Sequence, residues 1–269
     1  MIDAKFIYEE NSKLYVFLKF SKRRVLKNMK SGIWRFRHID YFRSCKDKER
    51  GDEKEGNSTV YQSDGATKWG SPFEQLESLY IRREGVDYER VLCICKLEID
   101  KEGNLKEQEI DVDKLKELGK LCCLIDYKAL YEKLRSKFPI LGAEDVTYYK
   151  EHSGFVRGSL LKEERYKHQH EHRIVIVAKE FIDEVKNNEN LKHIDKEISK
   201  NIVISEDKSK TVKKRQAADI AMEKLIKQEC KIKKDFYIDV DIEEDVLSNI
   251  VRVEKLRGVT NLYNNQLGF

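Results

Sequence analysis

The chain has 269 residues, of which 40% are hydrophobic and 38% are charged, and its formal net charge at pH 7 is +4. This balance indicates a highly charged globular protein with a sizeable core, and it excludes collagen-like and low-complexity proteins. A net charge this small does not by itself identify a nucleic-acid partner. No run of about 18 apolar residues is present, so the sequence predicts no membrane-spanning helix.

The N-terminal segment and the cysteines together predict a cytoplasmic protein. The opening MIDAKFIYEENSK has no basic stretch followed by an apolar stretch, so it is not a signal peptide. The six cysteines have no regular spacing, and we therefore expect reduced thiols in place of a disulfide framework.

The first 70 residues predict two strands, a helix and a loop. Residues 13–21, KLYVFLKFS, are aromatic and β-branched and predict a strand. Residues 22–32 predict a short helix that ends at Gly32. Residues 33–43, IWRFRHIDYFR, alternate bulky and polar side chains, which indicates a second strand running into a turn. Residues 44–70 are polar and glycine-punctuated, so we expect a long loop.

The middle of the chain predicts further strands and helices. Apolar runs predict buried strands, and a helical period before Pro139 predicts an amphipathic helix. The expected strands are residues 90–99, 120–127, 145–152 and 168–179, and the expected helices are residues 127–138 and 180–188.

The composition changes near Asn187. Residues 187–213 are charged and weakly periodic, so we interpret them as a linker or peripheral segment. After them we expect a helix at 213–234, a strand at 235–242 and a helix at 241–258. The sequence thus predicts an α+β domain with a mixed, mostly antiparallel sheet over residues 1–186, followed by a mixed, mostly helical extension over residues 187–269.

The segment HQHEHRIVIV, residues 168–177, carries candidate catalytic side chains. On a strand, alternate residues share a face, so Gln169, Glu171 and Arg173 would point to one side. The segment is polar on both faces at its start and apolar on both faces further on, which is typical of a strand emerging from a core into a cleft. Glu171 would then lie at a sheet end. The structural alternative is a simple Glu171–Arg173 ion pair.

The histidines of this segment suggest a different site. His168, His170 and His172 would share the other face of the strand, and His-x-His is a common metal-ligand spacing. The alternative function is a metal-dependent nuclease or hydrolase, with carboxylates near Asp52 and Glu55. Against it, the sequence has no HExxH or CxxC motif, so our main hypothesis expects no metal.

Several charged segments suggest a binding function. In ERGDEKEG, Arg50 offers a planar donor fork to phosphate between turn-forming glycines, but neighbouring acids make a solvated loop the better interpretation of this string alone. The segments SKRRVLKNMK, WRFRHIDYFR and KTVKKRQ contain many basic residues, and the second interleaves them with aromatics. A non-enzymatic nucleic-acid or protein-binding module of a defence system is therefore a second alternative.

Four short motifs resemble a pattern found in bacterial proteins associated with phage defence. They are FLKF at 17–20, the glycine-started segment ending in YFR at 32–43, RGDEKEG at 50–56 and EHRIV at 171–175. Their layout over residues 13–185 also resembles a remote form of the ADP-ribosyltransferase fold. The resemblance implies that NAD is bound as a substrate between the second strand and the strand of Glu171.

The same resemblance implies roles for individual residues. Glu171 corresponds to the catalytic glutamate, Tyr41 and Phe42 to the residues that stack on nicotinamide, and Lys19 to the first-strand residue that grips NAD. Gln169, two residues before Glu171, would help to select the acceptor. We therefore expect Glu171, Tyr41 and Gln169 to be catalytic.

Arginines would complete the NAD site. Arg37, Arg50 and Arg173 are expected to hold the pyrophosphate, because guanidinium groups bind phosphate in a bidentate way. The resulting hypothesis is a toxin-like or phage-defence enzyme that transfers ADP-ribose from NAD to a nucleic-acid or protein acceptor. Such an enzyme would have a cognate antitoxin or another defence partner.

Overall fold

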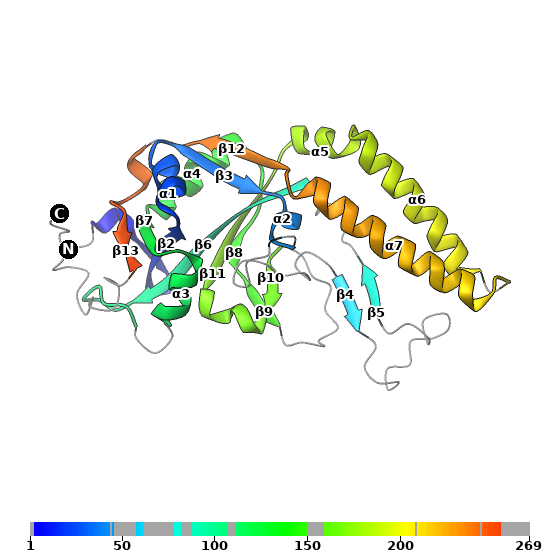
Figure 1. The fold of residues 1–269 in the computed structure, drawn as a ribbon. Helices are drawn as coiled ribbons and strands as arrows, with labels where there is room; N and C mark the ends of the chain where they lie inside the picture. Colours follow the sequence, from blue (N-terminus) through cyan, green and yellow to red (C-terminus); the bar gives the residue numbers. More distant parts are fainter. Residues whose placement is uncertain are drawn as a thin grey trace.

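A computed structural model describes residues 3–43, 45, 58–61, 78–81, 88–106, 111–149, 159–207, 209–242 and 244–253. Over these residues the chain forms helices and one large sheet in which every strand pairing is antiparallel (Figure 1). The predicted α+β class with a mostly antiparallel sheet is therefore confirmed.

Within the described residues the large sheet has nine strands. They are β1 (Ile7–Glu10), β2 (Lys13–Ser21), β3 (Ile33–Arg37), β6 (Glu89–Ile99), β7 (Leu121–Ile125), β8 (Ile140–Asp145), β11 (Glu171–Val177), β12 (Tyr237–Asp241) and β13 (Val251–Arg252). Two smaller pairs lie outside it, namely β4 (Ser58–Tyr61) with β5 (Ser78–Ile81) and β9 (Thr147–Tyr149) with β10 (Leu161–Glu163).

Strand β6 is central, and two strands share one of its edges. Cys95 pairs with Leu18 of β2, whereas Val91 pairs with Arg37 of β3. Both of these β6 residues also pair with β11, which therefore occupies the opposite edge. As a result β2 and β3 diverge from β6, and among the described residues no strand pairs with residues 92–94 on their side.

Seven α-helices and three short 3₁₀ helices are found in the described part of the chain. The α-helices are α1 (Arg23–Lys30), α2 (Ile39–Arg43), α3 (Val112–Leu118), α4 (Tyr127–Lys137), α5 (Lys179–Lys186), α6 (Glu189–Glu206) and α7 (Val212–Lys233), and the 3₁₀ helices that we label are η1 (Ala4–Phe6), η5 (Glu164–Gln169) and η6 (Glu244–Val246). No described helix is both long and apolar enough to cross a membrane.

The core lies on both faces of the sheet. On one face, side chains of α1, α4 and α5 pack with alternate strand residues such as Phe17, Leu92 and Ile174. On the other face the apolar residues form two separate clusters. One lies under α3 around Leu18 and Cys95, and the other lies under α2 and consists of Ile39, Val91 and Val175.

Several predicted elements are found, and others are different. The strands expected at 13–21, 90–99, 120–127 and 235–242 and the helices expected at 22–32, 127–138, 180–188 and 213–234 are confirmed with small shifts at their ends. Strand β9 covers the centre of the segment expected at 145–152, and β8 was not predicted. In the predicted loop 44–70, β4 forms a strand, and most of the remainder lies outside the described residues.

The prediction that residues 33–43 form one strand into a turn is wrong in its second half. Strand β3 ends at Arg37, and residues 39–43 form helix α2. The backbone N–H of Asp40 donates to His38 Nδ1 at 3.1 Å, and the N–H of Tyr41 donates to the His38 carbonyl at 3.0 Å. These two bonds turn the chain out of the sheet, so Tyr41 and Phe42 are presented from a helix.

Residues 187–213 were interpreted as a linker or peripheral segment, and the linker alternative is wrong. They contain helix α6, whose N-terminus is capped by the Asn188 side chain accepting from the Leu191 N–H at 3.1 Å. Leu191 and Ile194 are buried, and α6 lies side by side with α7 as a hairpin that extends from the sheet (Figure 1). Burial of one face stabilises this helix despite its high charge.

The helix expected at 241–258 is also wrong. The chain forms η6 and then β13, because this segment supplies partners to the edge of β7. Ser248 donates its N–H to the Leu124 carbonyl and accepts the Leu124 N–H on its hydroxyl. Strands β12 and β13 follow residue 187 and yet belong to the same sheet as β2 and β6.

Candidate functional site

A pocket of about 250 Å³ lies where β2 and β3 diverge from β6. Its floor is the β6 segment 91–95, and the remaining walls come from β2, α1, β3, α2, α3, η5, β10, β11 and β12. It also lies between the two apolar clusters of the second sheet face. We refer to it as the β6 pocket.

Most of the residues predicted for the active site line the β6 pocket. These are Lys19, Arg37, Tyr41, Phe42, Gln169 and Glu171. They come from segments far apart in the sequence, from Lys19 to Glu171, which only the folded sheet brings together. Arg173 is not among the lining residues, and Arg50 lies outside the described part of the chain.

Glu171, the first residue of β11, provides a carboxylate of the pocket, and Asp239 of β12 provides another. Its Oε1 accepts from Arg173 Nε at 2.7 Å and its Oε2 accepts from Lys162 Nζ at 2.8 Å. The side chain is only 6% exposed. Burial opposes ionisation, but the charges of Arg173 and Lys162 outweigh it and hold the Glu171 pKa well below its usual range. The group is therefore a carboxylate at neutral pH.

Three neighbours fix the position of Glu171. Buried Lys162, on β10, also donates to Gln169 Oε1 at 2.9 Å, so it connects Gln169 to Glu171. The backbone N–H of Glu171 donates to the Tyr148 hydroxyl at 2.8 Å. Burial raises the Tyr148 pKa, so this hydroxyl stays protonated. Arg173 Nη1 donates to the Ser159 carbonyl at 2.5 Å. This buried arginine therefore holds Glu171 in place without lining the pocket.

Arg37 is a cation of the pocket that contacts aromatic rings. Its guanidinium lies over the Tyr41 ring, 3.8 Å from the centroid, and 5.8 Å from the Tyr237 centroid. Among the described residues, none forms a salt bridge or side-chain hydrogen bond with it. Burial lowers the Arg37 pKa, but an arginine remains charged. By contrast, Arg35 is held by two hydrogen bonds to Asp239, at 2.7 and 2.6 Å.

Lys19 lies on the other side of the opening. Its Nζ donates to the Cys93 carbonyl at 2.5 Å, in the β6 segment that lacks a strand partner on that edge. Phe42 packs against the small cluster of Ile39, Val91 and Val175. The pocket therefore combines the ammonium groups of Lys19 and Lys162, the guanidinium groups of Arg35 and Arg37, the rings of Phe20, Tyr41 and Phe42, and the carboxylates of Glu171 and Asp239.

The histidine arrangement predicted for a metal is wrong. Residues 168 and 169 belong to η5, and His170 has a left-handed backbone with φ of 43°, so the strand begins only at Glu171. His168, His170 and His172 consequently do not share one strand face. Among the described residues, no group of three or more His, Cys, Asp or Glu side chains is placed to hold a metal ion. Asp52 and Glu55 lie outside the described ranges.

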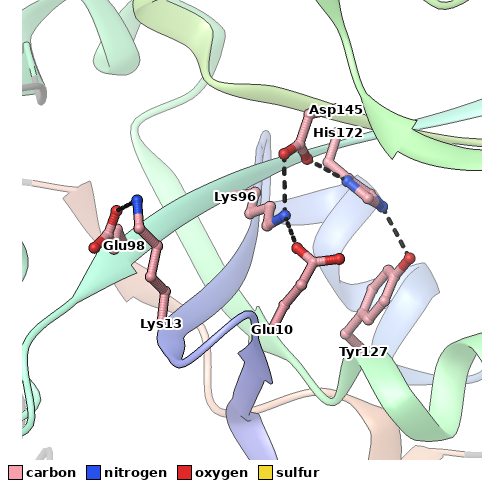
Figure 2. Close-up of polar contacts among 7 residues, drawn as sticks. All are labelled: Glu10, Lys13, Lys96, Glu98, Tyr127, Asp145 and His172. Atoms are coloured by element: carbon pink, nitrogen blue, oxygen red, sulfur yellow. Dashed lines mark hydrogen bonds and ion pairs between the residues drawn. The ribbon is translucent and has the colours of Figure 1, made fainter.

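His172 belongs to a polar network on the opposite face of β11. Figure 2 shows its ring between Asp145 and Tyr127, with Nδ1 2.6 Å from Asp145 Oδ1 and Nε2 2.9 Å from the Tyr127 hydroxyl. Lys96 bridges Asp145 at 3.0 Å and Glu10 at 2.7 Å. Burial opposes ionisation of Asp145, but bonds from His172 and Lys96 lower its pKa. The network joins β11 to β8, β6, β1 and α4.

Sequence reasoning missed Lys162, Tyr148 and the two β12 residues Tyr237 and Asp239. Lys162 and Tyr148 reach Glu171 from short strands, β10 and β9, that have no strong pattern of their own. The alternation of DFYIDVDI did predict β12, but not its pairing with β3. Comparisons with protein-family models, curated proteins and solved structures found no match to this chain.

The arrangement suits an anionic ligand with a planar ring. Arg37 and Lys19 provide positive charge, Tyr41 and Phe42 provide aromatic surface, and Glu171 provides a negative charge that is ionised in advance. A carboxylate held in a buried site stabilises positive charge that develops on a reacting group, because the low dielectric strengthens the interaction and little reorganisation is needed.

Proposed function

We propose that the protein is an NAD-consuming enzyme that transfers ADP-ribose to an acceptor and uses the β6 pocket as its active site. The supporting observation is that Glu171 lies in one pocket with Tyr41, Phe42, Arg37 and Lys19. Nucleotides carry phosphates and planar rings, and these are the groups that such side chains bind. The expected likeness to the ADP-ribosyltransferase fold is part of this proposal.

In the proposed reaction the bond between ribose C1′ and the nicotinamide nitrogen breaks. Nicotinamide leaves with the electron pair, and positive charge develops on the ribose. The acceptor's nucleophilic atom forms the new bond to C1′ and its proton passes to solvent. The Glu171 carboxylate stabilises the positive charge, while Arg37 binds a phosphate and the rings of Tyr41 and Phe42 contact the nicotinamide.

The size of the pocket suits the reactive half of NAD. Its volume of about 250 Å³ is just below the ~300–1,000 Å³ of typical small-molecule sites. The nicotinamide riboside end would occupy it, with the adenosine end towards solvent. Gln169, held by Lys162, would contact the acceptor beside Glu171.

The test is nicotinamide release from NAD, with water, oligonucleotides and proteins as acceptors. We expect Glu171→Gln to lower the rate by about 10²–10³-fold, which is typical for loss of one electrostatic stabiliser. Glu229→Gln is the matched control, because Glu229 is also a buried carboxylate paired with a lysine, Lys233, but lies on α7 away from the pocket lining. Equal release by wild type and Glu171→Gln with every acceptor contradicts the proposal.

A further inference from the structure

The exposed side of α1 carries four cations that have no partner among the described residues. Lys22, Arg23, Arg24 and Lys27 are all exposed, and none of them forms an ion pair or side-chain hydrogen bond within the described part of the chain. Some exposed lysines elsewhere are paired, such as Lys192 with Glu189. We refer to these four residues as the α1 basic surface.

Three of these charges, on Lys22, Arg23 and Arg24, are not placed to stabilise their own helix, whereas Lys27 lies in its last turn. Lys22 is the N-cap and the first turn has no acidic residue, although the N-terminal end of a helix dipole favours negative charge. Arg23 and Lys27 are four residues apart and repel each other. Their arrangement is unfavourable in isolation and becomes favourable when a polyanion lies across the helix.

The helix that carries the α1 basic surface also lines the β6 pocket. Val25 and Asn28, on the same helix, line the pocket. On β3, Arg35 stacks on Tyr237 of β12, and its guanidinium carbon lies 3.9 Å from the ring centroid. Tyr237 is 46% exposed, and Arg37 and Tyr41 continue this row of guanidinium and aromatic groups. Helix α1 and the elements of the aromatic row, β3, α2 and β12, therefore all border the same pocket.

We infer that the acceptor is a single-stranded nucleic acid that crosses α1 and the outer face of β3 and β12. Its phosphates contact the α1 basic surface and a base stacks on Tyr237, which brings a neighbouring nucleotide to Glu171. Unstacked bases are required for this contact, so a duplex does not fit. The inference rests on the proposed function, because the reaction at C1′ takes place in the β6 pocket.

Binding is tested by fluorescence anisotropy with a labelled single DNA strand of about 20 nucleotides, over about 50–200 mM salt. The variant Arg23→Ala/Arg24→Ala/Lys27→Ala should bind at least about tenfold more weakly, and its plot of log affinity against log salt should be shallower by about two units, since each phosphate contact contributes about 0.7 for single strands.

The matched control is Lys224→Ala/Lys227→Ala/Lys231→Ala, which removes the same charge from exposed positions on α7. It should bind like wild type. Tyr237→Ala should weaken binding of the single strand without changing the salt slope, because stacking releases no counterions. A duplex of the same length should bind more weakly than the single strand.

Three results overturn the inference. They are equal affinity and slope in the α1 variant and its control, duplex binding as tight as single-strand binding, or transfer to a protein acceptor that the α1 variant leaves unchanged. Failure of the proposed function alone gives a different result. The protein then shows no Glu171-dependent nicotinamide release but still binds the single strand. Such an outcome would identify a non-enzymatic binding module.

Discussion

Glu171 and His172 are neighbours on β11, but their side chains serve opposite faces of the sheet. Glu171 points to a pocket and is held by two buried cations. His172 points to the packed face and connects Asp145 to Tyr127 (Figure 2). Both side chains are almost fully buried. The comparison teaches that burial of a titratable group does not identify an active site, whereas access to a pocket separates the two positions.

The largest expected effect on stability comes from removing the Glu171 side chain on the pocket face. Glu171→Ala leaves Lys162 and Arg173 buried without their carboxylate, and removal of one member of a buried ionic group costs about 3–5 kcal/mol. Urea denaturation of the purified variant measures this loss. A cost under about 1 kcal/mol would mean that water replaces the carboxylate, and Glu229→Ala provides the comparison with a buried pair elsewhere.

A smaller effect is expected in the pH dependence of stability. The folded Glu171 pKa is depressed, so its stabilisation is present above the unfolded pKa of about 4.3 and is lost as the pH falls towards the folded value. The Tm of thermal unfolding should therefore fall less steeply between about pH 5 and pH 2 for Glu171→Gln than for wild type. Parallel curves for the two proteins would contradict the assigned ion pairs.

The smallest effect is expected on the opposite face. Tyr127→Phe removes the hydroxyl next to His172 Nε2 but keeps the ring, which stacks on Phe17 at a centroid distance of 4.0 Å. We expect a loss of about 1 kcal/mol in urea denaturation, typical of one hydrogen bond, and an unchanged rate of nicotinamide release. A large fall in that rate at unchanged stability would place the His172 network in catalysis and remove the contrast between the two faces.

The sequence alone placed Glu171 correctly at the sheet end, because the change from polar to apolar residues marks where a strand enters the core. Gln169, which we expected on the same strand face, lies in η5. The sequence did not show that His170 takes a left-handed backbone and that η5 precedes the strand. A local pattern does not report this turn, which is fixed by the backbone bond from Lys96 N–H to the His170 carbonyl at 2.9 Å.

Two further failures also have tertiary causes. Tyr41 and Phe42 read as the end of a strand because the alternation of bulky and polar residues continues past Arg37, but pairing with β12 stops there. Lys162 carries no signal in its own segment, since its role depends on β10 lying next to η5 and β11. Pattern reasoning therefore found the carboxylate and its partner Arg173 but missed the second cation, Lys162.

The pairing of β12 with β3 has a consequence for the order of folding. The Arg35–Asp239 ion pair joins residues 204 positions apart, and closing so long a loop costs entropy before any contact stabilises it. The wall that holds Tyr237 against the arginines therefore forms only after most of the chain has been synthesised. A nascent chain that ends before Tyr237 lacks this wall, so ligand binding at the opening reports completion of the fold.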